Sequence, residues 1–181
     1  QIDIFPVHRL DAATSGVLLF AKSSSVARTL SDGFKTHAHL RTYLCVVRGW
    51  LEAPSGRIDY PIDDKPSQTR YATLAQIEAP WPNKRHPTSR FSLMLVWPET
   101  GRTHQIRKHF AHLKHPLIGD TLYGDGFQNR LFRTHMVARR LWLRAHRMEL
   151  IHPETQAPLR ITAGREKEWA KVFELFGVCP L

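Results

Sequence analysis

The spacing of the apolar residues changes its period many times along the chain, and this limits the possible folds more than any other feature. The longest unbroken apolar runs, residues 16–21 and 93–97, are only as long as a strand. Elsewhere apolar residues recur at helical spacing, as Val26, Leu30 and Phe34 do. Such frequent changes of period favour an α+β domain over a helical bundle or a β-sandwich.

The same pattern predicts where the individual elements lie. A helix should follow the serines at 23–25 and end near residue 36, because serine is a preferred N-cap residue. The strand predicted at 90–97 is apolar on both faces, so we expect it to be central. The other predicted elements are strands at 16–22, 42–48 and 69–77, a short extended piece at 58–60, a hairpin at 148–152 and 159–161, and helices at 102–113 and 165–176.

Length and composition fit one globular domain that spans residues 1–181. With 42% hydrophobic residues, a chain of 181 residues can bury one sizeable core without disulfide bonds. No apolar run approaches the roughly 20 residues of a bilayer span, which excludes an integral membrane protein. The two cysteines, Cys45 and Cys179, share no Cys-x-x-Cys spacing. They fit a reduced, cytoplasmic protein in which both thiols are inert.

A net charge of +10 favours an anionic partner, of which nucleic acid is the simplest example. The charge is clustered, since residues 101–119 contain four Lys or Arg residues and no acidic residue. A second stretch without acids, residues 126–148, contains six arginines, among them Arg139 and Arg140. We interpret both stretches as candidate contacts for a polyanion.

The first candidate site is the segment 8–16, which reads His-Arg-Leu-Asp-Ala-Ala-Thr-Ser-Gly and precedes a predicted strand. Asp11 lies there in a polar loop beside Arg9, His8 and Thr14, where a carboxylate can be held ionised and act as a nucleophile. The alternative is a structural aspartate that accepts backbone N–H groups in an Asx-turn. The residues alone leave both interpretations open.

The second candidate site is the segment 101–109, which reads Gly-Arg-Thr-His-Gln-Ile-Arg-Lys-His. A turn followed by a helix that opens with Arg102 and His104 brings free backbone N–H groups and cations to one corner, which attracts anions. Arg102 and Arg107 are five residues apart, so one can bind phosphate while the other points inward. The alternative is a solvated basic helix face.

The histidines of this region, at 104, 109, 112 and 115, also suggest a metal site, but neighbouring cations and the lack of carboxylates make it a poor place for a dication. We therefore expect no metal. Neither a Gly-x-x-x-x-Gly-Lys-[Ser/Thr] phosphate loop nor a Gly-x-Gly-x-x-Gly motif after a strand occurs.

Taken together, the two motifs resemble the signatures of the RluA-type pseudouridine synthases. The segment 8–16 resembles the catalytic signature, and 101–107 with His-Pro-Leu-Ile-Gly-Asp at 115–120 resembles the second one. The finer motifs, at 47–50, 58–61, 123–126 and 128–130, look most like the tRNA pseudouridine synthase C branch. The resemblance implies an α+β domain with a mixed, mostly antiparallel sheet, flanking helices and a central basic cleft.

The resemblance also implies an activity and site residues. The enzyme would convert a uridine of RNA to pseudouridine without cofactor or metal, with tRNA as the expected substrate and rRNA as the alternative. Asp11 would be the nucleophile, Tyr43 would stack on the target base and could take a proton, and Arg107 would pair with the carboxylate. Arg9 would help to displace the target nucleotide. We assign Arg102, His104, Arg139 and Arg140 to substrate binding, and expect a cytoplasmic monomer.

The chain departs from the family pattern at two places. It starts at Gln1 and lacks the segment that precedes the first signature in the family, so we expect this N-terminal segment to be missing. The span around Asp64 and Lys65 is also short. The rival hypotheses are an RNA-binding paralogue without activity, against which intact Asp11, Tyr43 and Arg107 argue, and a basic module whose histidines bind metal.

Overall fold

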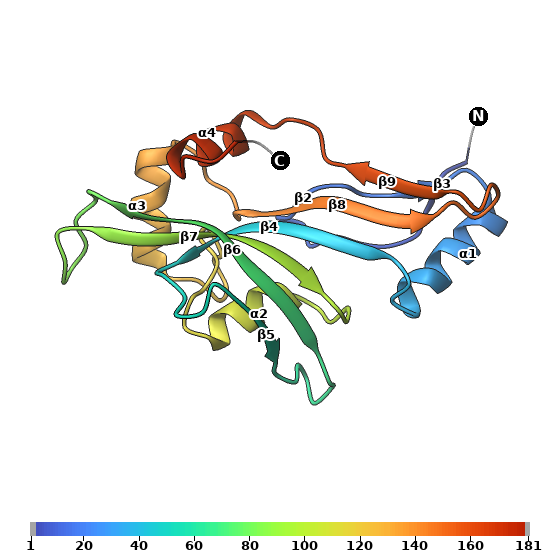
Figure 1. The fold of residues 1–181 in the computed structure, drawn as a ribbon, viewed down its shortest axis with the longest axis horizontal. Coiled ribbons are helices and arrows are strands. Elements are labelled where there is room, and N and C mark those ends of the chain that lie inside the picture. Colours follow the sequence, from blue (N-terminus) through green and yellow to red (C-terminus); the bar gives the residue numbers. More distant parts are fainter. Residues whose placement is uncertain (1–2, 180–181) are drawn as a thin grey trace.

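The computed structural model describes residues 3–179, and its centre is a mixed sheet that is mostly antiparallel (Figure 1). Among the strands within residues 3–179, the one parallel pairing joins residues 15–16 to residues 144–145. A separate pair, β1 (Phe5–Pro6) with β3 (Phe20–Ala21), lies beside the sheet. In spatial order the sheet consists of β2 (Ser15–Gly16), β8 (Leu143–Ile151), β4 (Leu40–Arg48), β7 (Ser89–Pro98), β6 (Gln68–Ala79) and β5 (Ser55–Asp59), and β9 (Pro158–Thr162) pairs with β8.

Helices cover both faces of the central strands β4 and β7. Alternate residues of a strand point to opposite faces. Leu44 and Val46 pack in one cluster with α3 (Gly126–Met136) and α4 (Lys167–Leu175), while Cys45 and Val47 pack in another with α2 (Gln105–His112). A third cluster joins β1, β3 and α1 (Ser24–Lys35) at the far end of the sheet (Figure 1). The α+β class and the central position of the 90–97 strand are confirmed.

The strand predicted at 16–22 is wrong as a single element. Gly16 pairs with β8, whereas Phe20 and Ala21 pair with β1, so the run divides between two sheets. Gly16 has φ +108°, and a Cβ there would lie 2.1 Å from the carbonyl oxygen of Ala145. Glycine is needed at this close approach, where the chain leaves the sheet.

The helix α3 has no counterpart among the predicted elements. Asp125 caps its N-terminus by accepting the N–H groups of Phe127 and Gln128, as expected of an aspartate N-cap. Phe132 and Met136, four residues apart, bury its apolar face. The predicted helix at 102–113 begins later than expected, at Gln105, because His104 adopts a left-handed conformation with φ 55° and ψ 27°.

The structure also bears on two sequence predictions, those about membrane-spanning segments and about the two cysteines. None of the helices within residues 3–179 has the length and apolar character required to cross a bilayer. Cys45 is buried in β4 and Cys179 is exposed, and both are free thiols. Burial raises the pKa of the Cys45 thiol, which disfavours the reactive thiolate.

A buried histidine on β8 makes the free energy of unfolding depend on pH. His146 is 2% exposed, and neither ring nitrogen has a hydrogen-bond partner among the described residues. Burial, with Arg144 and Arg147 nearby, lowers the pKa of His146 from 6.5 to about 4. The unfolded chain therefore binds a proton that the folded chain excludes, and stability falls as the pH drops from 6.5 towards 4.

We expect the His146→Leu variant to lose less stability in acid than the unchanged protein. From a pKa lowered to about 4, the histidine should cost the folded state about 2 kcal/mol at pH 5, at 1.4 kcal/mol per pH unit. Urea unfolding at pH 7 and pH 5 measures the difference, and identical pH dependence in both proteins would contradict it. His8, whose pKa burial also lowers to about 4, contributes equally to both.

Candidate active site

Asp11 lies in the loop between β1 and β2, and neighbouring contacts fix this loop. The backbone N–H of Thr14 donates to the carbonyl of Asp11 at 2.8 Å, which forms a turn. His8 stacks on Phe34, with 4.5 Å between ring centroids, and its Nε2 accepts the N–H of Leu19. Burial lowers the pKa of His8 to about 4, so its imidazole stays neutral and can accept this bond. His8 thus anchors the loop rather than facing the carboxylate.

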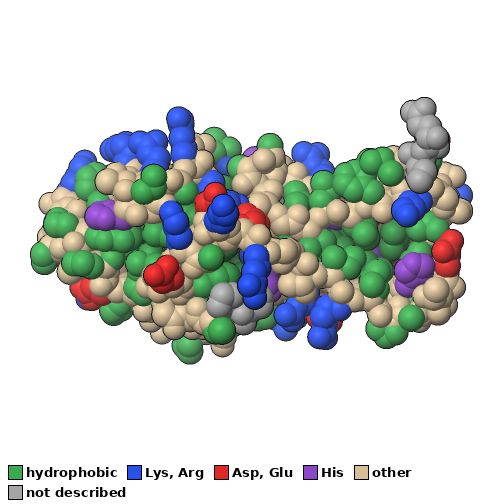
Figure 2. Space-filling view, turned by 90° about the horizontal axis from the view of Figure 1, so that it is seen from above, with side chains coloured by type: hydrophobic (Ala, Val, Ile, Leu, Met, Phe, Trp, Pro, Cys, Tyr) green, Lys and Arg blue, Asp and Glu red, His purple; other side chains and the backbone are tan. Residues whose placement is uncertain are grey.

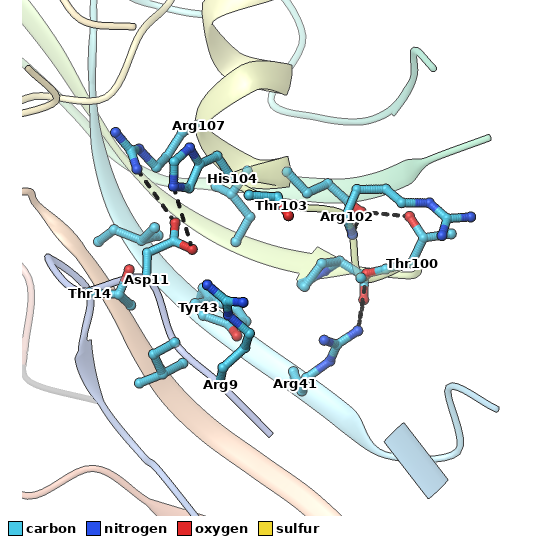
Figure 3. Close-up of a pocket in the computed structure, with 16 residues that line it drawn as sticks. Arg9, Asp11, Thr14, Arg41, Tyr43, Thr100, Arg102, Thr103, His104 and Arg107 are labelled. Carbon is cyan, nitrogen blue, oxygen red and sulfur yellow. Dashed lines mark hydrogen bonds and ion pairs between the residues drawn. The ribbon is translucent and has the colours of Figure 1, made fainter. Parts of the chain in front are cut away.

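The Asp11 carboxylate faces the start of α2, where Arg107 and His104 lie (Figure 3). The Nη1 atom of Arg107 is 3.6 Å from Oδ2 of Asp11, and Nε2 of His104 is 4.0 Å from Oδ1. Within residues 3–179 no backbone N–H donates to this carboxylate. The side chain is therefore directed at Arg107 and His104, which contradicts the Asx-turn interpretation, and it stays partly exposed to a ligand.

Arg107 is held in place by a second carboxylate, that of Asp120, which is not among the predicted site residues. Its Nε and Nη2 atoms donate to Asp120 at 2.6 and 2.8 Å. Arg107 is 8% exposed and Asp120 2%. Hydrogen bonding to Asp120 raises the pKa of Arg107. Burial would raise the pKa of Asp120, but hydrogen bonds from Arg107 and from the N–H groups of Tyr123 and Leu122 lower it overall. Both partners stay charged, with Nη1 left to face Asp11.

Tyr123 connects this ion pair to His104. Its hydroxyl is 3.1 Å from Nδ1 of His104, and its ring lies under the Arg107 guanidinium at 5.1 Å. His104 itself keeps a left-handed backbone that few residues other than glycine adopt. Tyr123 and Asp120 thus orient the two side chains, His104 and Arg107, that face Asp11.

Tyr43 lies on β4, next to an irregularity in the pairing of β4 with β8. Thr42 pairs with Arg147 but Tyr43 with Ala145, so His146 is the extra residue of a bulge. Bulges redirect side chains beside active sites. Burial raises the pKa of Tyr43, and the charge of Asp11 raises it further against the opposing effect of Arg41. The phenol therefore keeps its proton at neutral pH.

A pocket of about 140 Å³ is lined by Asp11, Tyr43, His104 and Arg107. Arg9, Arg41 and Arg102 also line it (Figure 3), and Arg41 donates to the carbonyls of Pro98 and Thr100. Asp11 is the only acidic residue among those described that line the pocket. A single carboxylate among several arginines leaves the lining with an excess of positive charge, which suits an anionic ligand. Six of the predicted residues meet here: Arg9, Asp11, Tyr43, Arg102, His104 and Arg107.

The structure places the other two predicted residues elsewhere. Arg139 is exposed on a neighbouring groove. Arg140 also borders that groove, but its guanidinium donates to Ser15 at 2.6 Å and to Glu166 at 2.9 Å. Arg140 therefore connects the end of the Asp11 loop to the start of α4.

The helix α2 is buried rather than a solvated basic face. Gln105 and Arg107 are buried, and Gln105 accepts from the N–H of Arg102 and the hydroxyl of Thr100. His109 is fully buried against the hydroxyls of Ser67 and Thr69. Within residues 3–179 no three His, Cys, Asp or Glu side chains are placed to hold a metal ion.

The sequence of this chain is similar to those of known proteins. The sequence model of a family described as RNA pseudouridylate synthase matches residues 1–112. The chain is 44% identical to the tRNA pseudouridine synthase C of Vibrio cholerae, over 96% of this chain and 78% of that protein. It is also 44% identical to the tRNA pseudouridine synthase C of Pasteurella multocida, over 96% of this chain and 77% of that protein.

Two solved human structures share the fold. The first, RNA Pseudouridylate Synthase Domain Containing 1, has a TM-score of 0.71 at 22% identity and covers 98% of this chain and 82% of its own. The second, RNA Pseudouridylate Synthase Domain Containing 4, has a TM-score of 0.73 at 20% identity and covers 96% and 76%. At these identities the similarity concerns the fold.

Proposed function

The chain belongs to the RNA pseudouridylate synthase family, and from this premise we propose that it converts a specific uridine of tRNA to pseudouridine, with Asp11 as the nucleophile. The enzyme class follows from the family, and the choice of tRNA rests on the names of relatives that are 44% identical. The single observation that supports the nucleophile is the Arg107 guanidinium 3.6 Å from the carboxylate of Asp11.

The reaction needs a nucleophile that can leave again. Asp11 attacks either the pyrimidine ring or the anomeric carbon of the ribose, and the C1′–N1 bond breaks. The base then turns and forms a C1′–C5 bond, the bond to Asp11 breaks and returns its electron pair to the carboxylate, a proton leaves C5 and one is gained at N1. Atoms and charge balance without an oxidant or a reductant. Only the ionised carboxylate can begin this sequence, and the Arg107 guanidinium lies 3.6 Å from it.

A uridine stacked in RNA hides both its C5 and its glycosidic bond, so the enzyme must flip it out at a cost of a few kcal/mol. Tyr43 in the pocket can receive the base by stacking, and the exposed Arg9 can fill the vacated position. Arg102 and His104, at the same pocket, would bind the flanking phosphate. We further propose a cytoplasmic monomer that acts without metal or cofactor, with Arg139 and Arg140 near the bound RNA.

We expect Tyr43→Leu to lower turnover by about 10- to 100-fold, because base–aromatic stacking contributes ~1–3 kcal/mol. Tyr43→Phe keeps the ring and should lose less than Tyr43→Leu. Single-turnover rates on a tRNA transcript measure both variants. Equal losses in the two would show that the hydroxyl, rather than the ring, is what the reaction requires.

Mapping pseudouridines with a carbodiimide in RNA from cells that lack the protein tests the substrate. We expect one tRNA position to lose its signal and to regain it when the gene is restored. A lost position in rRNA would replace tRNA by the alternative substrate. An unchanged map of both RNAs would reject the proposed activity.

A further inference from the structure

A second groove lies beside the catalytic pocket. It has a volume of about 240 Å³ and lies between the loop at 119–126, α3 and the segment 138–140. Figure 2 shows Lys and Arg side chains gathered at the end of the molecule that carries α3. The residues that matter for its chemistry are Asp120, Asn129, Arg130, Arg133 and Arg139.

Three guanidinium groups of this groove have no partner within the described part of the chain. Arg130, Arg133 and Arg139 are exposed, and none of them forms an ion pair or donates a side-chain hydrogen bond there. Other arginines nearby are engaged, since Arg48 pairs with Asp125 and Arg140 with Glu166. The three cations therefore have no structural role that accounts for their charge.

The only carboxylate that lines the groove, among the described residues, cannot neutralise these cations. Asp120 has no exposed side-chain surface and is already bound to Arg107. Arg130 and Arg133 are three residues apart on α3, so they lie on one helix face with about 5–6 Å between their Cβ atoms. The groove thus presents a row of uncompensated positive charge that suits an extended polyanion.

Asn129 fixes the groove relative to the nucleophile. Its side-chain oxygen accepts the N–H of Gly119 and its NH₂ group donates to the carbonyl of Asp120, both at 2.7 Å. The carboxylate of the same Asp120 holds Arg107, which faces Asp11. Gly119 has φ +81°, and a Cβ there would lie 1.8 Å from the carbonyl oxygen of Arg140. The backbone of the loop at 119–126 therefore borders the groove, while the carboxylate of Asp120 in this loop binds the Arg107 that lines the pocket.

We propose that this groove binds backbone phosphates of the RNA substrate beside the flipped uridine, with Arg130, Arg133 and Arg139 as the contacts. The inference rests on the proposed function, which supplies the RNA. Because the loop at 119–126 connects the groove to the pocket, phosphates bound on α3 set the position of the RNA backbone relative to Asp11. The groove provides affinity that does not depend on sequence, while the pocket receives the base.

The test measures binding of an unmodified tRNA transcript to the triple variant Arg130→Gln, Arg133→Gln, Arg139→Gln over a range of salt concentrations. The control is Lys22→Gln, Arg28→Gln, Lys171→Gln, which removes the same charge from exposed positions outside the groove. We expect the groove variant to lose at least about tenfold in affinity and its salt slope to fall by about two to three. The control should stay within about twofold of the unchanged protein.

Replacing the three arginines by lysine keeps the charge and should retain most of the affinity, while a thermal unfolding curve shows that each variant is folded. A groove variant that binds with the affinity and salt slope of the control would overturn the proposal. Binding is measured separately from turnover. Unmodified tRNA bound normally without any pseudouridine formed would instead count against the proposed function.

Discussion

Replacing Asp11 with asparagine should lower pseudouridine formation at least about a thousandfold, as loss of a nucleophile does in other enzymes. The amide keeps the size of the side chain but cannot attack. Arg107 keeps its position in this variant, because its Nε and Nη2 atoms are bound to Asp120 and not to Asp11. The loss therefore reports the chemistry of one carboxylate rather than a collapsed pocket. Single-turnover assays with the enzyme at saturating concentration and in excess over tRNA measure it.

The affinity of the Asp11→Asn variant for tRNA should stay within about tenfold, since phosphate contacts dominate the binding of nucleic acids. Asp63→Asn is the matched control. Asp63 is an exposed aspartate that pairs with Lys108 at 3.0 Å, and it does not line the pocket. The Asp63→Asn change removes the same negative charge as Asp11→Asn and should leave turnover unchanged. Turnover retained in Asp11→Asn would remove Asp11 from the reaction.

The second large effect is expected at Asp120. Replacing it with asparagine leaves Arg107 as a buried cation without its partner, and breaking a buried pair in this way costs about 3–5 kcal/mol. Turnover should fall as well, because the guanidinium that faces Asp11 is no longer oriented. Urea unfolding and single-turnover rates measure the two losses, with Asp63→Asn again as the control.

The pairing can be tested separately from the individual residues. Arg107→Met should lower turnover more than affinity, and it removes the cation that Asp120 serves. In the double variant, the Asp120→Asn change should therefore cost much less stability than it does alone, with a coupling of at least about 1 kcal/mol. Additive losses in the double-mutant cycle would show that Asp120 stabilises the fold independently of Arg107.

Acid should weaken the same pair. The pKa of Asp120 is lowered in the folded protein, so its contribution to stability is present above the pKa of the unfolded chain. That contribution is lost as the pH falls through the lowered pKa of Asp120 in the folded protein. The Asp120→Asn variant should lack this low-pH component, while the component from His146 at higher pH remains.

Much of the fold could be predicted because local patterns and tertiary packing agree. In β4 and β7 both faces are apolar, and both are buried under helices. The amphipathic spacing of Leu30 with its neighbours likewise corresponds to α1. The prediction of one strand at 16–22 was wrong because the pattern shows only that these residues are apolar, and not which sheet each of them joins. The close approach at Gly16 divides the run between two sheets, and Phe20 remains 43% exposed.

The candidate site likewise has features that the sequence predicts and features that it does not. The two signatures each contribute a residue to one pocket, Asp11 and Arg107, although 96 positions of chain separate them. What the sequence could not show is which cations are already paired. Arg140 and Arg139 are adjacent in the chain, yet Arg140 bonds Glu166 while Arg139 is free within the described residues. Such pairing depends on the distant α4.

Asp120 could have been found. It ends the His-Pro-Leu-Ile-Gly-Asp segment at 115–120, and a buried arginine needs a carboxylate partner. Tyr123 gave no comparable signal, because its contact with His104 requires the left-handed turn at the start of α2.

The most direct test of the account follows the hydrogen at C5. Pseudouridine formation turns C5 into the glycosidic carbon, so tRNA labelled with tritium at C5 of its uridines must release tritium to water when the enzyme acts. We expect the purified protein to release tritium up to a plateau equal to a single uridine of the tRNA, and the Asp11→Asn variant to release none above background. Tight binding of the labelled tRNA by the unchanged protein without any tritium release, or equal release by both proteins, would contradict it.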